Sequence, residues 1–591
     1  MTSTATAKAK AVMPMNDLQL VIAEKPSVAQ SIANAIGADK RNKGYCEGNG
    51  YLVSWCIGHL AELCYPEIYD ENYAKWKTED LPIVPREWKY GVDGKKKEQF
   101  TVLKKLMNRS DVSEVVNACD AGREGERIFR TVYRMAGCRK PMKRLWISSL
   151  EDEAVKEGFH HLKSGKEYDS LYDAAECRAK ADWLVGMNFS WLFSLAYHQR
   201  FSVGRVLSPT LAFITERQNE IESFCPVPFY TVELKNENGV IVSDKFNTGE
   251  EAQAVKDQCL SEPPVFASSA SEEHREKAPL LYDLTSLQRD ANRIHGFTAQ
   301  QTLDYTQSLY ERKLCTYVRT DSMYLTDDME KTAEKLFSPC SSVLKIVSDL
   351  NRLNASVLCD SRKVSDHHAI IPTVSIDGYD LSSLPQGEKK IIFLVMKRLL
   401  EAASDDYIYE TVTYNFTRGE CEFKAKQTFV KQLGWKLFEG KEAVDDKPFM
   451  FKVGESLKGF EAQVKEGKTK PKKEYTEDTL LSAMETAGKG EIPDDAERQG
   501  IGTPATRAEV IEKLISSGYV RREGKKLIPD ETGINLVSVL PESLKSASLT
   551  AEWEQKLKQV EKGELSPESF MESVTEYISD LIAAFKKENS V

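Results

Sequence analysis

Two side chains that could act together on a phosphodiester stand two positions apart in the stretch Leu314–Thr326. Tyr317 supplies a phenol that can attack phosphorus, and Arg319 supplies a guanidinium that can hold phosphate oxygens. Residues two apart point to the same side of an extended segment, so both groups are expected to face one site. A phenol has an ordinary pKa of about 10 and is a poor nucleophile at neutral pH, so this chemistry needs further charged groups nearby.

Carboxylates that could complete such a site follow two predicted strands. The apolar run Leu18–Glu24 ends in a carboxylate, and Val115–Cys119 is followed directly by Asp120. A helix is predicted after each run, and in an open α/β sheet the carboxyl ends of the strands line one crevice, so Glu24 and Asp120 are expected to converge. Glu124 would lie on the first turn of the second helix and face the same crevice.

Clustered carboxylates next to a phosphate site suit Mg²⁺, a hard cation that prefers oxygen ligands. Glu24, Asp120 and Glu124 are therefore candidate metal ligands. The alternative is helix capping, with Asp120 as the N-cap and Glu124 as a partner of the helix dipole. The sequence has no glycine-rich nucleotide loop, which argues against ATP, and no Cys-x-x-Cys pair, which argues against a zinc ribbon and for reduced thiols.

The whole chain has the composition of a globular protein. Its 591 residues suffice for three or four domains, 41% are hydrophobic and 29% are charged. It has no membrane-spanning apolar run, and its head, Met1–Asp17, lacks the features of a secretory signal, so a cytoplasmic location is expected. The net charge of −11 disfavours a polyanionic partner at first sight, but basic residues predominate between Arg178 and Arg217.

Six stretches resemble, in the same order, the motifs of type IA DNA topoisomerases, and the resemblance is strongest to the topoisomerase III group. They are Ile22–Ser27, Asp120–Glu126, Ser202–Thr210, Tyr317–Ser322, Asp366–Thr373 and Gly502–Arg507. The second motif also resembles the Toprim domain, which carries Asp-x-Asp-x-Glu. Here Gly122 replaces the middle acid, and Leu207 stands where the family usually has glutamine.

The resemblance implies an enzyme that breaks one DNA strand transiently, passes a strand and rejoins the break without ATP. Tyr317 would become linked to the 5′ phosphate, while Arg319 and Lys25 stabilise the pentacovalent phosphate. Glu24 would protonate the leaving 3′ oxygen if its pKa is raised, and His367 would bind the phosphate or orient Asp120. The implied DNA-binding residues are Ser202, Gly204, Arg205, Thr320, Asp321, Ser322 and Arg507.

The expected fold is a multidomain torus that combines α/β, helical, winged-helix-like and β-rich parts. The expected segments are a disordered tail (1–17), a Toprim domain (18–150), a helical core (151–224), a β-rich arch (225–279), a helical insertion that carries Tyr317 (280–402), the rest of the arch (403–466), a basic linker (467–477) and a second helical and winged-helix-like part of the core (478–591).

Two other functions are compatible with parts of the sequence. A Toprim nuclease or primase would use Glu24, Asp120 and Glu124 but not the tyrosine segment, and a catalytically silent DNA clamp would fit Gly122 and Leu207. The resemblance implies single-stranded and negatively supercoiled DNA as partners, a helicase as a further partner, a monomer, and a place at the nucleoid. Relaxation of supercoils and decatenation remain equally compatible with the sequence.

Overall fold

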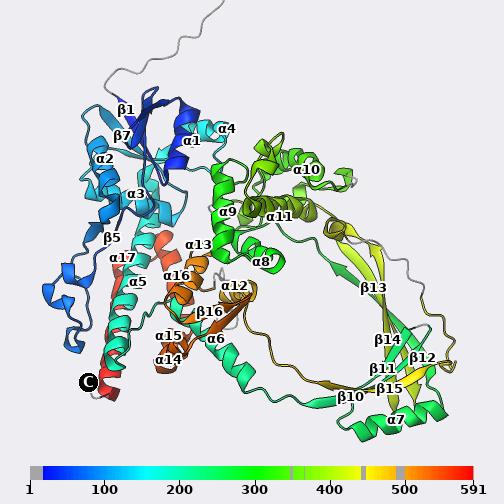
Figure 1. Cartoon of the computed structure of the whole chain (residues 1–591). Coiled ribbons are helices and arrows are strands. Elements are labelled where there is room, and N and C mark those ends of the chain that lie inside the picture. The colour runs from blue at the N-terminus through cyan, green and yellow to red at the C-terminus, as the bar shows by residue number, and fades with distance from the viewer. Residues whose placement is uncertain are drawn as a thin grey trace, which may run out of the picture.

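The computed structural model describes residues 17–237, 239–346, 350–364, 367–440, 448–487 and 500–589, and the statements below concern these residues. They form a ring around a central hole (Figure 1). An α/β domain packs on a helical core, a β-rich arch extends from the core, and a helical insertion returns from the arch to the α/β domain. The predicted toroidal fold class is confirmed, whereas residues 1–16 of the predicted tail and Asp366 lie outside the described residues.

The α/β domain is built on β1 (Leu18–Ala23), the middle strand of a seven-stranded sheet with the order β2-β3-β4-β1-β7-β8-β9. β1 pairs in parallel with β4 and β7, and its last four residues are fully buried. Parallel strands covered on both faces read as continuous apolar runs, which is why the sequence predicts this strand. The other strands are β2 (Lys40–Asn42), β3 (Tyr45–Gly48), β4 (Tyr51–Trp55), β7 (Val112–Ala118), β8 (Met142–Arg144) and β9 (Lys163–Ser164).

Each of the two predicted strand–helix units is present. α1 (Pro26–Ile36) follows β1 and ends at Gly37, whose φ of 80° is the left-handed cap expected of glycine. α3 (Arg123–Met135) follows β7, and a Cβ at Gly125 would lie 1.9 Å from the Asp120 carbonyl oxygen. Only glycine therefore lets the first turn of α3 lie against the end of β7. The domain also contains α2 (Lys97–Met107), α4 (Asp152–His160) and the pair β5 (Ala61–Leu63) and β6 (Tyr90–Val92).

The helical core is organised around α5 (Asp169–Ala196), which contacts α3, α16 and α17. α13 begins at Pro504 with Thr503 as its N-cap and is followed by the β16–β17 hairpin, as predicted. None of the described helices is both long and apolar enough to span a bilayer. The remaining core elements are α6 (Leu207–Glu222), α12 (Glu477–Thr486), α13 (Pro504–Ser516), β16 (Val520–Glu523), β17 (Lys526–Pro529), α14 (Glu531–Val539), α15 (Glu542–Lys545), α16 (Ala547–Glu561) and α17 (Pro567–Asn589).

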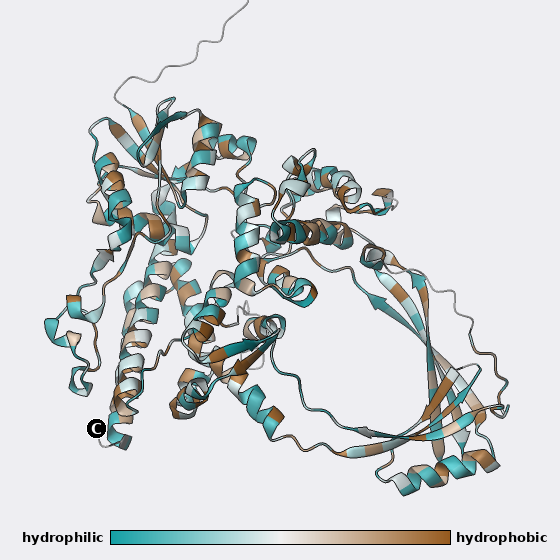
Figure 2. Ribbon diagram, viewed as in Figure 1, coloured by the Kyte–Doolittle hydropathy of each residue, from teal (hydrophilic) through white to brown (hydrophobic). Residues whose placement is uncertain are grey.

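The arch is one six-stranded sheet made from two separate parts of the chain. Its order is β12-β13-β14-β11-β10-β15, and three pairings join the two parts: β12 with β13, β11 with β14, and β10 with β15. Hydrophobic and hydrophilic residues alternate along its long strands (Figure 2), as expected for antiparallel strands with one buried face. The elements are β10 (Pro228–Asn236), β11 (Gly239–Ser243), α7 (Gly249–Ser261), β12 (Val265–Glu276), β13 (Tyr407–Arg418), β14 (Cys421–Gln432) and β15 (Glu461–Lys468).

The insertion contains α8 (Leu284–His295), α9 (Ala299–Glu311), α10 (Glu330–Leu344) and α11 (Gln386–Ala402). It also packs on the core, where Arg289 lies 2.9 Å from Asp478. The Glu477 carboxylate accepts a hydrogen bond from the Ala299 backbone N–H at the start of α9, at 2.6 Å. The helix that leads to Tyr317 is therefore capped by a residue of the core.

The turn before α6 is tied into the helical core. Ser208 is not the N-cap, because α6 begins at Leu207 and the Ser208 hydroxyl accepts a hydrogen bond from Gly204 N. Arg205 is not presented to a ligand in this structure, because its side chain is only 1% exposed. Its guanidinium lies 2.9 Å from both Asp182 and Glu554 and ties α5 and the start of α6 to α16. A direct contact between Arg205 and the DNA backbone remains a prediction, which these buried ion pairs do not favour.

Arg205→Ala should therefore destabilise the fold. Removing one partner of a buried ion pair leaves uncompensated charge and costs about 3–5 kcal/mol, so the thermal unfolding midpoint should fall by several degrees. The exposed Arg200→Ala is the matched control and should leave the midpoint unchanged. An Arg205→Ala protein with an unaltered midpoint but weaker binding to single-stranded DNA would contradict this assignment.

Candidate active site

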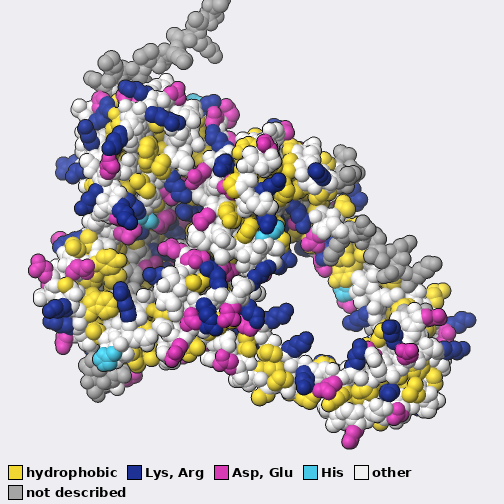
Figure 3. Space-filling model, viewed as in Figure 1, with side chains coloured by type: hydrophobic (Ala, Val, Ile, Leu, Met, Phe, Trp, Pro, Cys, Tyr) yellow, Lys and Arg dark blue, Asp and Glu magenta, His cyan; other side chains and the backbone are white. Residues whose placement is uncertain are grey.

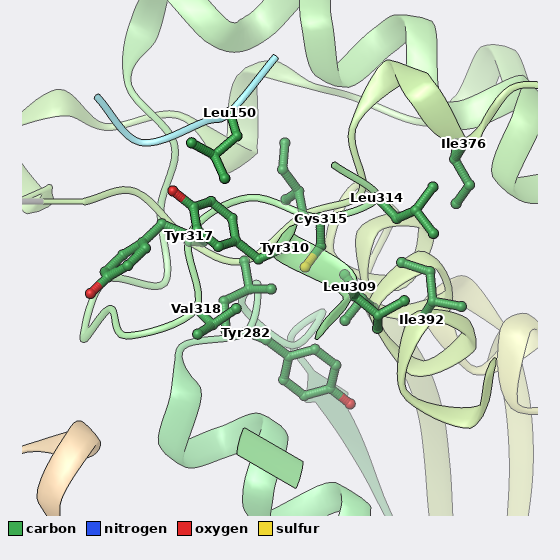
Figure 4. Close-up of a cluster of buried hydrophobic side chains, with 14 of the residues drawn as sticks. Leu150, Tyr282, Leu309, Tyr310, Leu314, Cys315, Tyr317, Val318, Ile376 and Ile392 are labelled. Carbon is green, nitrogen blue, oxygen red and sulfur yellow. The ribbon is translucent and has the colours of Figure 1, made fainter. Parts of the chain in front are cut away.

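Tyr317 lies where the insertion meets the α/β domain. It follows α9 in an irregular extended segment, in which Thr316 N donates to Ile371 O and Tyr317 N donates to Ser148 O. The side chain is only 5% exposed. Figure 4 shows its ring at the edge of a hydrophobic cluster with the hydroxyl directed away from Leu314 and Cys315. The hydroxyl therefore points out of the insertion toward the other domain.

The Tyr317 hydroxyl donates a hydrogen bond to Asp120 Oδ2 at 3.1 Å. Burial and the negative charge of Asp120 raise the pKa of Tyr317 well above its ordinary value, so the phenol is protonated at neutral pH. Asp120 does not cap α3, because the N-cap is Gly122 and no side chain bonds there. The capping interpretation of Asp120 is therefore wrong, and its carboxylate is the acceptor closest to the phenol.

Glu24 and Arg319 form the second pair, with 3.6 Å between Glu24 Oε1 and Arg319 Nη1. Burial and the charge of Asp120 raise the pKa of Glu24 to about 8, although Arg319 and Lys25 act in the opposite direction. Glu24 Oε2 and Arg319 Nε are buried without a hydrogen-bond partner. Glu24 is thus a neutral acid at pH 7, as required of a general acid.

Lys25 stands just before α1, and its side chain reaches from the α/β domain to the insertion. Its Nζ lies 3.6 Å from Glu311 Oε1, at the C-terminal end of α9, and both side chains are partly exposed. The structure therefore brings together Tyr317, Arg319, Glu24 and Lys25, each cation resting beside a carboxylate.

His367 is held in one orientation by two hydrogen bonds to the α/β domain. Its Nδ1 lies 3.0 Å from Ser148 Oγ, and its Nε2 lies 2.6 Å from the Ala121 carbonyl oxygen. Burial lowers the pKa of His367 to about 4, so the ring is neutral, and Nε2 must carry the proton because a carbonyl can only accept. The ring centroid lies 4.2 Å from that of Tyr317. His368 instead bonds the Ala369 carbonyl oxygen.

The third predicted metal ligand has another partner in this structure. Glu124 lies on the first turn of α3, as predicted, but its carboxylate is hydrogen-bonded to His59. Although burial opposes it, this contact lowers the pKa of Glu124 to about 2. Among the described residues no group of three acidic, histidine or cysteine side chains is assembled for a metal ion. Gly122, at the position of the missing acid, has a φ of 143°, which favours glycine.

The buried Oε2 of Glu24, which has no protein partner, and the Asp120 carboxylate nonetheless fit a hard cation. Both are oxygen donors, and they lie close enough for the negative charge of Asp120 to contribute to the raised Glu24 pKa.

Arg144 is a functional residue that sequence reasoning missed. Its buried guanidinium donates to the carbonyl oxygens of Asn117, Cys119 and Asp120 at the end of β7 and to that of its neighbour Leu145, and its Nε lies 2.7 Å from Glu126. One of those carbonyls belongs to Asp120, at 2.7 Å, so Arg144 fixes the backbone that carries the Tyr317 acceptor. Its position at the end of the short strand β8 gave no signal of this role in the sequence.

The remaining predicted DNA contacts fall into two groups. Thr320 and Ser322 are buried and bond the backbone around them, including the His367 carbonyl oxygen, so they shape the tyrosine segment, whereas Asp321 is exposed. Ser202, Gly204 and Arg507 bond to neighbouring groups of the core and insertion: Tyr519 Oη, Ser208 Oγ and Thr285 Oγ1. A direct role of these side chains in DNA contact remains a prediction.

Glu24 generates a testable pH dependence. Between its ordinary pKa of 4.5 and its folded value of about 8, the folded protein keeps a proton that the unfolded chain has released. The free energy of unfolding contributed by this group must fall as the pH rises through that interval. Glu24→Gln stays neutral, so its thermal midpoint minus that of the wild type should increase from about pH 5 to about pH 9. A difference that does not change with pH would contradict the raised pKa.

Known proteins share both halves of this arrangement. Residues 19–150 match the family model of the Toprim domain, and residues 166–572 match the family model described as DNA topoisomerase. DNA topoisomerase 3 of Bacillus subtilis is 38% identical over 597 residues, which cover 96% of this chain and 82% of that protein. DNA topoisomerase 3 of Bacillus licheniformis is also 38% identical, with the same coverage.

The fold is shared with a solved structure. Full-length topoisomerase I from Thermotoga maritima superposes with a TM-score of 0.75 over 95% of this chain and 90% of that chain, at 23% sequence identity. The match extends beyond the Toprim domain to the tyrosine-bearing part, which a Toprim nuclease or primase does not require. The chain therefore belongs to the type IA DNA topoisomerase family and is a strand-passing DNA topoisomerase.

Proposed function

We propose that this topoisomerase breaks a single DNA strand with Tyr317, using Glu24, Lys25, Arg319 and Asp120 at the reacting phosphate. The observation that carries this assignment is the hydrogen bond from the Tyr317 hydroxyl to Asp120, at the mouth of a site that also holds a neutral Glu24. A phenol beside a carboxylate acceptor and a second carboxyl group that is protonated are the two halves of a transesterification site.

In this mechanism the Tyr317 oxygen attacks phosphorus and its proton passes to Asp120. The bond between phosphorus and the 3′ oxygen breaks, and the Glu24 carboxyl gives its proton to that oxygen. The products are a 5′-phosphotyrosine and a free 3′ hydroxyl, and the reverse sequence rejoins the strand. One ester replaces another, so the bond energy is retained and no ATP is needed.

Lys25 and Arg319 can bind the phosphate by exchanging their present carboxylate partners for its oxygens. In the resting protein they lie beside Glu311 and Glu24, each at 3.6 Å, which is longer than a close charged hydrogen bond. A phosphate entering between them can take both cations. In a site from which water is excluded, these charges stabilise the pentacovalent phosphate more strongly than they would in water.

Mg²⁺ is the cofactor that this site would take. Glu24 and Asp120 would hold it, with Glu124 joining only if it leaves His59. When bound, the ion supplies positive charge beside the phosphate. Two carboxylates make a weak site, so activity should require a relatively high Mg²⁺ concentration. The absence of a zinc requirement remains a prediction.

DNA access requires the insertion to separate from the α/β domain, because the Tyr317 side chain is almost completely covered. Lys and Arg side chains around the central hole (Figure 3) support its use for a DNA strand, despite the net negative charge of the protein. Relaxation of negative supercoils and decatenation are both proposed as outcomes of its strand passage. A helicase partner, a monomeric state and a location at the nucleoid are further predictions.

Tyr317→Phe tests the nucleophile. The variant keeps the ring and its packing, so its stability should change by no more than about 1–2 kcal/mol, the net worth of one hydrogen bond. It should neither relax supercoiled plasmid nor leave a covalent protein–DNA adduct when the reaction is stopped with denaturant. Tyr324→Phe is the control and should form the adduct normally. If Tyr317→Phe retains the adduct, Tyr317 is not the nucleophile.

Substitution of Gly122 tests the metal site. Because the φ of this residue is 143°, a side chain there should cost about 1–3 kcal/mol of strain, whatever its charge. Gly122→Asp and Gly122→Ala should therefore lower activity alike, and neither should reduce the Mg²⁺ concentration that gives half-maximal relaxation. A lower Mg²⁺ requirement in Gly122→Asp alone would place this side chain at the metal and overturn the argument from backbone conformation.

A further inference from the structure

A row of aromatic rings leads to Tyr317 from inside the α/β domain. Trp146, two residues after the end of β8, stacks on Tyr168 with centroids 5.0 Å apart and an interplanar angle of 17°. Its ring is also parallel to the imidazole of His367, at 6.4 Å and 9°. That imidazole in turn contacts Tyr317 at 4.2 Å. Trp146 is thus one ring removed from the nucleophile.

Trp146 is itself fixed by its surroundings. The guanidinium of Arg144 lies 5.0 Å from its ring centroid, and Tyr168, just before α5, covers it. Arg144 also holds the Asp120 carbonyl oxygen. The segment 144–148 therefore makes three contacts with the site. Arg144 donates to the Asp120 carbonyl oxygen, Trp146 lies parallel to the His367 ring, and Ser148 is a hydrogen-bond partner of His367.

The hydrogen bonds of His367 leave one freedom that Trp146 can remove. Ser148 and the Ala121 carbonyl oxygen bind the two nitrogens in the plane of the imidazole. A tilt of that plane about the line through the two nitrogens would leave both bond lengths almost unchanged but shift the surface against which the Tyr317 ring rests. A flat indole parallel to the imidazole opposes such a tilt, because aromatic rings hold preferred relative orientations.

We propose that Trp146 is a positioning residue for strand cleavage, which acts through His367 to set the orientation of the Tyr317 ring relative to Asp120. The proposal rests on the proposed function of Tyr317. Trp146 touches neither nucleophile nor DNA in this assignment, so its effect must depend on the presence of His367. A residue that merely fills space would act independently of His367.

A double-mutant cycle in the full-length protein tests this dependence. Trp146→Leu removes the flat ring while keeping an apolar side chain, and it should slow single-turnover cleavage of a saturating single-stranded oligonucleotide by roughly 10- to 100-fold, as for other misplaced reacting groups. Trp146→Phe keeps an aromatic plane and should restore most of the rate. In a His367→Ala background, Trp146→Leu should have almost no further effect.

The control is Trp76→Leu, which removes a comparable stack, on Trp191 at 4.8 Å, far from the site in sequence. It should leave cleavage unchanged. Thermal midpoints of all variants separate folding defects from slow chemistry, and Trp146→Phe keeps the test usable if Trp146→Leu does not fold. In nitrogen-labelled histidine spectra, His367 should keep its Nε2–H form in the wild type and Trp146→Phe and lose it in Trp146→Leu.

The possible outcomes are distinct. If the wild type forms no adduct, or Tyr317→Phe still forms one, the proposed function fails rather than this inference. If the adduct forms but Trp146→Leu cleaves at the wild-type rate, the inference is overturned. If the rate losses caused by Trp146→Leu and His367→Ala multiply in the double mutant, the inference is also overturned, because the tryptophan then acts independently of the histidine.

Discussion

The contact between the Tyr317 hydroxyl and Asp120 Oδ2 is the interaction on which this structure depends, because its two partners belong to separate domains. Asp120 stands at the carboxyl end of β7 in the α/β domain, and Tyr317 follows α9 in the insertion. The chain reaches the insertion only by way of the core and the arch (Figure 1). The toroidal path of the chain therefore brings a tyrosine back to a carboxylate that lies almost two hundred residues earlier in the sequence.

Closing that contact buries charged groups, and burial gives them their chemical properties. Glu24 keeps its proton because the closed interface removes water and leaves Asp120 nearby, while Tyr317 is held as a neutral phenol by the same two effects. Lys25 and Arg319 offset part of this cost by lying next to carboxylates. The resting site thus holds its cations on internal partners that a DNA phosphate can replace once the domains separate.

The backbone at the start of α3 constrains this site as strongly as the charges do. Gly125 permits the helix to touch the Asp120 carbonyl, and Gly122 adopts a conformation that other residues reach only with strain. Arg144 then holds the Asp120 carbonyl from the other side of the chain. Gly122 stands where the Toprim pattern has its middle acid, and its backbone conformation favours glycine at this position.

The sequence by itself determined the elements and most of the chemical groups. Apolar runs predicted β1 and β7 and the helices that follow them, and the ordered motifs identified the family, because these signals are local and depend on a few neighbouring residues. The sequence also placed Glu24 and Asp120 together, since the carboxyl ends of parallel strands must meet at one edge of a sheet. The resemblance to the family joined Tyr317 to them.

Only the tertiary structure decided which groups are free to react and which hold the fold together. Arg205 has the charge and position of a phosphate contact, yet Asp182 and Glu554, the latter almost 350 residues away, enclose its guanidinium. Glu124 turns to His59, and Arg144 and Trp146 gain their roles from partners in other elements. The physical reason is that burial and partner choice are set by long-range packing, and a pKa or an exposed fraction has no value until those partners are in place.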